Sequence, residues 1–113
     1  MRIIKKPWGH EEIWAETDRY VGKILYIQAG HRLSLQYHEK KTETIRVQQG
    51  TLILTLGNSD GSTFETRLQA GQSYHVATGT VHRFGAGDND VVLVEVSTPE
   101  LDDVVRLQDD YKR

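Results

Sequence analysis

Residues 30–50 read GHRLSLQYHEKKTETIRVQQG, and this stretch decides the fold class. Apolar and polar side chains alternate over Leu33–His38 and again over Thr42–Gln49. This alternation is typical of β-strands, whose successive side chains point to opposite faces. A glycine bounds the stretch at each end, and glycines commonly mark turns. The stretch therefore predicts two adjacent strands joined by a short turn over Glu39–Thr42.

Short runs of β-forming residues continue on both sides of this pair, separated by glycine-containing turns. Further strands are expected at Tyr20–Ile27, Thr51–Leu56, Thr63–Leu68, Ser73–Ala77, Val81–Phe84 and Val91–Val96. Many short strands between regular turns predict an all-β sandwich or barrel. The tail from Pro99 onward leaves room for one helical turn. Because strands and helices do not alternate, a doubly wound nucleotide-binding fold is not expected.

The composition of the chain excludes several classes of function. The 113 residues carry 14 basic and 16 acidic side chains and no cysteine. A net charge of −2 argues against a nucleic-acid-binding surface, and the lack of cysteine excludes disulfides, thiolate metal sites and cysteine nucleophiles. No apolar run is long enough to span a bilayer, and the first residues lack the apolar segment of a signal peptide. We expect one domain in the cytoplasm, without nucleic-acid or membrane partners.

Polar side chains are expected to converge inside the barrel. Gln36 and His38 share one face of their strand, while Glu43 shares a face of the next strand with two apolar residues, Ile45 and Val47. A buried carboxylate is costly unless it is paired or bound to a cation. Glu43 therefore indicates a site, unless it lies at the strand end and reaches water.

A second imidazole is available from His82, which follows a glycine turn, although a lone histidine there is often a packing residue. Imidazole, carboxylate and amide ligands without thiolates suit zinc, manganese, iron or nickel. An open coordination position would make such a site catalytic rather than structural.

The spacing of these residues resembles the two motifs of the cupin superfamily. The first motif joins a glycine, His-x-His, a glutamate and a second glycine, and here it reads Gly30, Gln36-Tyr37-His38, Glu43 and Gly50. The second motif joins a glycine, Pro-x-Gly and a histidine, and here it reads Gly71, Ala77-Thr78-Gly79 and His82. The departures are Gln36 in place of the first histidine, Ala77 in place of the proline, and Ala86 in place of the closing asparagine.

The cupin resemblance implies a fold and a ligand set. The expected fold is all-β, a single cupin barrel (a double-stranded β-helix or jelly roll) over residues 1–113, with its core at residues 20–97. The implied ligands of one divalent metal per chain are Gln36, His38, Glu43 and His82. Zinc is the expected metal, and manganese, iron and nickel are the alternatives.

A narrower resemblance covers the chain from end to end. The Gln-x-His, Glu and later His resemble the metal set of mannose-6-phosphate isomerases. The chain also looks like the C-terminal isomerase domain of bifunctional mannose-1-phosphate guanylyltransferases at Lys6–Gly9, Arg32–His38, Asp102–Arg106 and Asp109–Arg113. It has no counterpart of their guanylyltransferase domain, so nucleotidyl transfer is not expected. Where they carry extra histidines and Arg-Ala-Glu-His, residues 38–44 read HEKKTET, which implies different substrate contacts.

This resemblance implies a metal-dependent aldose–ketose isomerase acting on a sugar phosphate of the mannose 6-phosphate type. Arg106, as a catalytic residue, and Arg32 and Arg113, as substrate-binding residues, match positions of the resembled domain, and arginine suits phosphate. Among the other residues, Lys23 is a candidate for the general base. Glu11 and Glu12 are further candidates. The alternative for Lys23 and for the arginines is an ordinary solvated surface charge.

Two other functions remain open, since a fold does not fix a function. One is a non-catalytic metal-binding cupin that binds or senses a small, sugar-like ligand. The other is an iron-dependent dioxygenase, which the Gln-His-Glu-His set makes less favourable than the isomerase.

Two expectations concern residues outside the proposed site. Leu33, Leu35 and Tyr37 lie on the face opposite Gln36 and would need cover from another sheet or subunit, so we expect a homodimer. Trp8 and Trp14 are expected to pack against the barrel. The histidines that match no ligand position are His10, His31 and His75.

Overall fold

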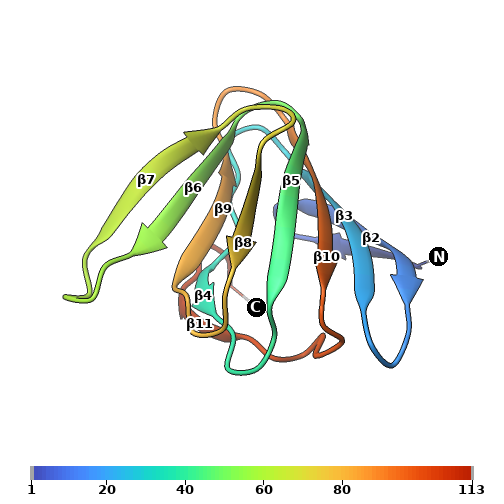
Figure 1. Cartoon of the computed structure of the whole chain (residues 1–113). Helices are drawn as coiled ribbons and strands as arrows, with labels where there is room; N and C mark the ends of the chain where they lie inside the picture. The colour runs from blue at the N-terminus through green and yellow to red at the C-terminus, as the bar shows by residue number, and fades with distance from the viewer. Residues whose placement is uncertain (1, 113) are drawn as a thin grey trace.

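The structure, a computed structural model, describes residues 2–112, and all of its regular secondary structure there is β-strand (Figure 1). The strands are β1 (Arg2–Lys6), β2 (Gly9–Glu16), β3 (Val21–Ile27), β4 (Leu35–Tyr37), β5 (Glu43–Gln49), β6 (Leu52–Gly57), β7 (Thr63–Leu68), β8 (Ser73–Val76), β9 (His82–Ala86), β10 (Val91–Ser97) and β11 (Val105–Gln108). A six-stranded sheet has the order β1-β2-β3-β10-β5-β8, and a five-stranded sheet has the order β11-β4-β9-β6-β7.

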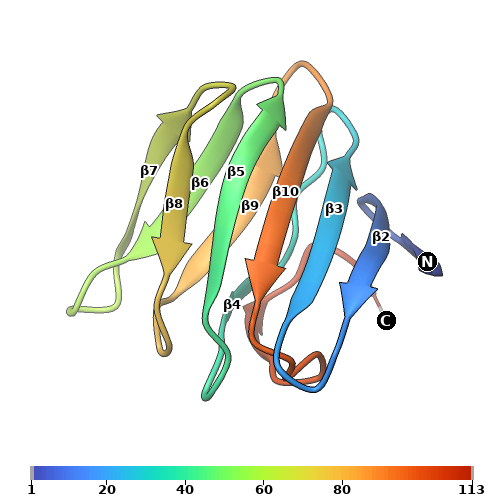
Figure 2. The same cartoon turned by 45° about the vertical axis from the view of Figure 1, so that its right-hand side comes forward.

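The two sheets face each other, and the chain crosses repeatedly from one to the other (Figure 2). All pairs of neighbouring strands are antiparallel. At one end of the molecule the hairpin of β6 and β7 projects away from the other strands (Figure 1). The predicted all-β barrel is confirmed.

Alternation of side chains along each strand builds the core. In β5, Ile45 and Val47 are fully buried, while Arg46 between them is exposed. Leu54 and Phe84 of the five-stranded sheet belong to the same buried cluster. The inward positions of both sheets therefore fill the barrel, as expected for strands with one face on a core.

The interior changes from apolar to charged along the same strands. Leu93 of β10 pairs with Leu25 of β3, and two residues further along, Glu95 pairs with Lys23. All four side chains are buried. The charged pair lies toward the lower end of the barrel in Figure 1, where β3 begins and β10 ends. This lower end holds the candidate site.

One glycine turn leads directly into that end. Gly79 has a φ of 82°, a left-handed conformation that glycine adopts without steric cost. Its amide donates to the carbonyl of His38, 2.8 Å away, which ties the turn before β9 to the turn after β4. The amide of Thr80 donates to the carbonyl of Ala77 at 3.1 Å, so the turn forms with alanine at position 77.

The strands extend beyond the core expected at residues 20–97. β1 and β2 add a hairpin to the six-stranded sheet, and β11 adds an edge strand to the five-stranded sheet. The tail thus forms a strand that pairs with β4 and not a helical turn. The strand expected over Leu33–His38 is shorter, since β4 covers Leu35–Tyr37. Within residues 2–112, no helix has the length and apolarity needed to cross a membrane.

Candidate metal centre

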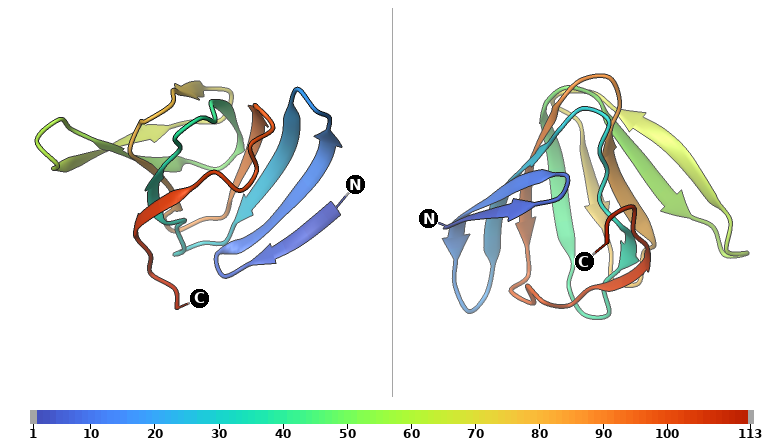
Figure 3. Two further views of the ribbon diagram at one scale, coloured as in Figure 1. Left: turned by 90° about the horizontal axis from the view of Figure 1, so that it is seen from below. Right: turned by 180° about the vertical axis from the view of Figure 1, so that it is seen from behind.

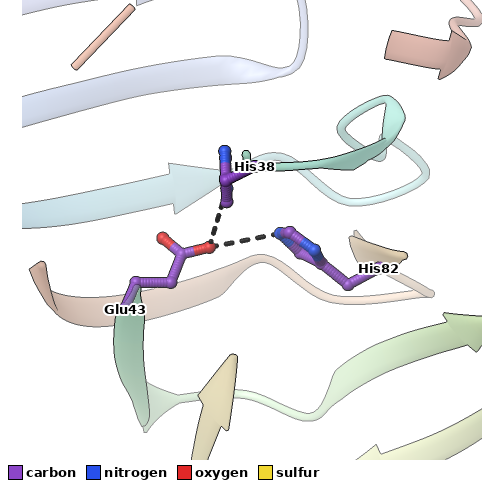
Figure 4. Close-up of side chains that lie close together, drawn as sticks. All are labelled: His38, Glu43 and His82. Carbon is purple, nitrogen blue, oxygen red and sulfur yellow. Dashed lines mark hydrogen bonds and ion pairs between the residues drawn. The ribbon is translucent and has the colours of Figure 1, made fainter. Parts of the chain in front are cut away.

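Three predicted ligands meet at the lower end of the barrel. His38 follows β4, while Glu43 and His82 begin β5 and β9. Nε2 of His38 lies 3.3 Å and Nε2 of His82 lies 3.2 Å from Oε1 of Glu43 (Figure 4). The candidate ligand atoms all lie within 4.8 Å of one another, and the three side chains are buried. This group is compact enough to hold one metal ion.

Hydrogen bonds on the far side of each ring orient the two imidazoles. Nδ1 of His38 lies 2.6 Å from the carbonyl oxygen of Asp103, and Nδ1 of His82 lies 2.8 Å from that of Thr80. A carbonyl only accepts, so each Nδ1 carries the proton and donates. In a neutral ring Nε2 then presents its lone pair toward Glu43. This is the arrangement that metal-binding histidines use.

The ring of His82 also leaves a polar atom without a hydrogen bond. Its Nε2 is fully buried and makes no hydrogen bond, although it lies close to Glu43. A buried polar atom without a partner is unusual in native structures and calls for an explanation such as an ion. Two lone pairs aimed at one carboxylate oxygen repel unless a cation or a proton lies between them. The residues present therefore fit a divalent metal.

Lys41 joins this group from the turn between β4 and β5. Its Nζ lies 3.4 Å from Oε2 of Glu43 and 3.4 Å from Oε2 of Glu95. Burial acts to lower the pKa of Lys41, but the charges of Glu95 and Glu43 outweigh it and raise the pKa. Lys41 and Glu95 are not among the site residues expected from the sequence. A lysine in a charged turn gives no sign of burial, whereas the inward alternation of Val91, Leu93 and Glu95 does indicate the glutamate.

The pKa values of the two carboxyl groups beside Lys41 are shifted in opposite directions. Burial acts to raise the pKa of Glu43. Hydrogen bonds that His38 and His82 donate where they carry a proton on Nε2, together with the charge of Lys41, hold the pKa well below its usual range. Burial and the nearby charge of Glu43 raise the pKa of Glu95 to about 8. The centre thus combines an ionised carboxylate, suited to a cation, with a carboxyl group that binds protons more readily.

Gln36 lies beside this group, as predicted. It pairs with His82 across β4 and β9, and it lines the same cavity as His38 and Glu43. That cavity measures about 110 Å³ and opens between the two sheets. The role of Gln36 as a further metal ligand stays a prediction.

The same cavity brings Lys23 and Arg106 near the centre. Lys23 is buried, with only 7% of its surface exposed, so it is not the solvated lysine considered as the alternative. Its Nζ lies 3.6 Å from Oε1 of Glu11, which is buried as well. Both residues line the cavity, as do Arg106 and Lys6. Of the candidates for the base, Glu12 is absent from the cavity lining.

Comparison with known proteins identifies the family. The family model described as "Mannose-6-phosphate isomerase C-terminal" matches residues 1–109. The chain belongs to this family. A mannose-1-phosphate guanylyltransferase of Escherichia coli K12 is 33% identical over 116 residues, which cover 99% of this chain and 23% of that protein. The alginate biosynthesis protein AlgA of Pseudomonas aeruginosa is 32% identical over 114 residues, covering 97% of this chain and 23% of AlgA. The chain spans about a quarter of the length of these curated relatives.

Solved structures share the fold of this family member. The capsular polysaccharide assembling protein CapF from Staphylococcus aureus has a TM-score of 0.81 at 17% identity, over 95% of this chain and 34% of CapF. KdgF from Halomonas sp. has a TM-score of 0.77 at 19% identity, over 90% of this chain and 91% of KdgF. Oxalate decarboxylase from Bacillus subtilis has a TM-score of 0.80 at 13% identity, over 94% of this chain and 30% of that protein. The fold is the double-stranded β-helix of the cupins.

Within this isomerase-family chain, one predicted substrate-binding arginine, Arg32, is not brought to the centre. Arg32 does not line the cavity that holds His38 and Glu43. Its Nε lies 2.6 Å from Oδ2 of Asp110, and its Nη2 lies 3.0 Å from Oδ1, in an exposed ion pair. The position of Arg113 lies outside the described residues. The geometry therefore does not support Arg32 as a phosphate contact.

The expected packing of the remaining aromatic and apolar residues holds only in part. Trp8 is buried in the core, but Trp14 is 51% exposed on the six-stranded sheet. Leu35 is buried within the chain. Leu33 lines the cavity and does not point away from it, because the regular strand begins only at Leu35. The three remaining histidines, His10, His31 and His75, lie outside the centre, as expected.

Proposed function

We propose that this chain holds one divalent zinc ion per chain on His38, Glu43 and His82, with Gln36 as a further ligand, and isomerises a sugar phosphate. The observation that carries the proposal is the convergence of two oriented histidine Nε2 atoms on one oxygen of a buried carboxylate. Nitrogen and oxygen donors without thiolate suit zinc, and four protein ligands leave room for substrate in an expanded coordination. Membership of the mannose-6-phosphate isomerase C-terminal family supports this reaction.

A bound metal would polarise the carbonyl and hydroxyl oxygens of an open-chain sugar and stabilise the negative charge that develops on them. The chain's own residues supply the remaining requirements. Lys41 adds a fixed positive charge beside Glu43, and a preorganised charge of this kind stabilises a developing anion without reorganisation.

The proton transfer is assigned to the buried pair of Glu11 and Lys23. In the forward direction the carboxylate of Glu11 takes the proton from C2 of an aldose, and the electron pair of that bond forms the C1–C2 double bond while O1 gains negative charge. The proton then returns to C1 as O2 becomes the ketone oxygen, with the O2 proton passing to O1. Lys23, 3.6 Å from Oε1 of Glu11, holds the carboxylate in place. A positioned base of this kind contributes about 10²–10⁴-fold.

The phosphate group is assigned to Arg106 and Lys6, in place of Arg32. Both residues line the cavity, and they come from β11 and β1, edge strands of different sheets. Arg106 is exposed and the Lys6 side chain is 27% exposed, so both can meet a charged group that keeps part of its hydration. Arginine and lysine are the usual phosphate donors.

A paired assay tests the proposal. Purified protein and its His82→Ala and His10→Ala variants are compared for zinc content and for interconversion of mannose 6-phosphate and fructose 6-phosphate. We expect about one zinc per chain and turnover in the wild type. His82→Ala loses both. His10 stacks on Tyr26 outside the cavity, with ring centroids 4.3 Å apart, so His10→Ala keeps both. Bound zinc without turnover of any sugar phosphate would support the non-catalytic binding protein instead, and iron with oxygen uptake would support the dioxygenase.

A homodimer is also proposed, on a different face from the one first considered. Trp14 and Val96 are each 51% exposed, and both flank Gly22 on the outer face of the six-stranded sheet, Trp14 by lying across it and Val96 as its pairing partner. An apolar patch that meets its own copy forms the self-complementary interface of a two-fold dimer. We expect a dimer in sedimentation equilibrium and a monomer for Val96→Lys; a monomeric wild type would contradict the proposal.

A further inference from the structure

The segment between β10 and β11 crosses the lower end of the barrel, where the metal centre lies (Figure 3). We name residues 98–104 the C-terminal strap. It begins with a reciprocal pair of hydrogen bonds: the amide of Thr42 donates to Oγ1 of Thr98, and the amide of Thr98 donates to the carbonyl of Thr42, each 3.1 Å long. The strap is thus fastened to the turn that joins β4 and β5.

One strap residue, Asp103, binds three consecutive backbone amides of that turn. Its Oδ1 accepts from the amide of Glu39 at 3.1 Å, and its Oδ2 accepts from the amides of Lys40 at 2.7 Å and Lys41 at 2.9 Å. The amide of Lys41 is partly buried, and a backbone donor in that setting needs a hydrogen-bond partner. Asp103 therefore fixes the backbone from which the Lys41 side chain projects.

The backbone of the same residue contacts a metal-ligand candidate. The Asp103 carbonyl accepts from Nδ1 of His38 at 2.6 Å, across 65 positions of sequence. The Nδ1 atom of His82 makes its hydrogen bond elsewhere, to the carbonyl of Thr80, two residues earlier, and not to the strap. The two imidazoles are therefore oriented by independent devices, one distant in sequence and one local.

We propose that Asp103 is the positioning residue that connects the strap to the metal centre. The Asp103 carboxylate holds the turn between β4 and β5 in place. The Asp103 carbonyl can then keep the His38 proton on Nδ1, and the Lys41 side chain stays beside Glu43. The inference rests on the metal centre of the proposed function and is independent of the isomerase reaction. Partners that orient a ligating histidine typically contribute about 10- to 100-fold to metal affinity.

The test compares Asp103→Ala with Asp102→Ala, a change at the neighbouring exposed residue. In metal-free protein, long-range ¹H–¹⁵N correlation spectra report which ring nitrogen of each histidine carries the proton. The wild type should show a protonated, hydrogen-bonded Nδ1 for both His38 and His82. Asp103→Ala should lose the hydrogen-bonded Nδ1 proton for His38 and retain it for His82. Its zinc affinity in competition with a chelator should fall about 10- to 100-fold. Asp102→Ala should match the wild type in both measurements.

A purely structural role would give a different result. An Asp103→Ala protein of lower thermal stability, but with a wild-type His38 spectrum and zinc affinity, would overturn the proposal. If Asp103→Ala does not fold, Asp103→Asn serves, since it keeps one acceptor oxygen and turns an NH₂ toward the amide donors; an unchanged His38 spectrum and affinity there would overturn it too. A wild type that binds no zinc would refute the metal centre, and the His38 spectrum would still decide the role of Asp103.

Discussion

The two ends of the barrel interior are built from the same strands but hold opposite kinds of side chain. At the upper end Leu25 and Leu93 pair across β3 and β10, and at the lower end Lys23 and Glu95 pair across the same two strands. All four side chains are buried. The sheet therefore decides which positions face inward, and the residue type at each position decides whether that part of the interior stabilises the fold or serves a site.

The energetics of the two ends differ in sign. Burying apolar surface is favourable at roughly 25 cal/mol per Å², whereas burying charges costs free energy that close pairing only partly returns. The apolar end can thus hold the strands in register while the charged end keeps groups such as Glu43 and Glu95 near each other. A charged cavity of this kind is an arrangement that stability alone would not select.

The largest loss of stability is expected from Lys41→Met, which removes a buried positive charge from the lower end of the barrel. It removes the cation between Glu43 and Glu95, and breaking a buried pair on one side typically costs about 3–5 kcal/mol. In metal-free protein, urea unfolding should show this loss, and adding Glu95→Gln should recover part of it. Lys40→Met, at the exposed neighbouring position, is the control. Equal stabilities of the Lys41 and Lys40 variants would mean that the lower end does not depend on this network.

A similar or slightly smaller loss of stability is expected from Leu54→Ala, which leaves a cavity in the apolar part of the barrel. Leu54 is fully buried, and truncating a buried leucine to alanine typically costs about 2–5 kcal/mol of unfolding free energy. Zinc affinity should stay at the wild-type value, because the cavity is not lined by this residue. Leu107→Ala, at a leucine that is 50% exposed, should change stability by about 0.5 kcal/mol or less. A loss of metal in Leu54→Ala would show that the two ends are not separable.

Some residues of the charged lower end could be predicted from the sequence, and others could not. The inward position of Glu43 follows from local alternation with Ile45 and Val47, so one carboxylate among apolar neighbours is visible from the sequence alone. His38 and His82 follow from motif spacing. These predictions depend on contacts within a strand or a turn, which local pattern describes well.

The rest of the site depends on contacts between distant segments. Lys41 lies in a charged turn, which predicts exposure, and it becomes buried only because residues from β10 and the strap lie next to it. The orientation of His38 comes from Asp103, 65 positions away, and the ion pair of Arg32 comes from Asp110, 78 positions away. No periodicity in a single sequence encodes such pairings, so an arginine expected at the substrate lies elsewhere.

The smallest effect on stability is expected at the exposed ion pair of Arg32 and Asp110. This pair can be compared with the buried pairs that Lys41 makes. Arg32 and Asp110 form a two-point contact, but both side chains are more than 40% exposed, and exposed pairs contribute about 0–1 kcal/mol. The hydrogen bond and charge of Arg32 lower the pKa of the Asp110 carboxyl. A carboxyl whose pKa is lower in the folded state stabilises the fold above its unfolded pKa, about 3.9, and loses this contribution as the pH falls through the folded value. The small stability difference between wild type and Arg32→Ala at about pH 6 should therefore shrink as the pH falls below the unfolded pKa, and vanish once Asp110 is protonated in the folded state as well. Arg19→Ala, at an exposed turn, should show no such change. A loss for Arg32→Ala as large as that for Lys41→Met would mean that burial is not what separates strong from weak ion pairs in this fold.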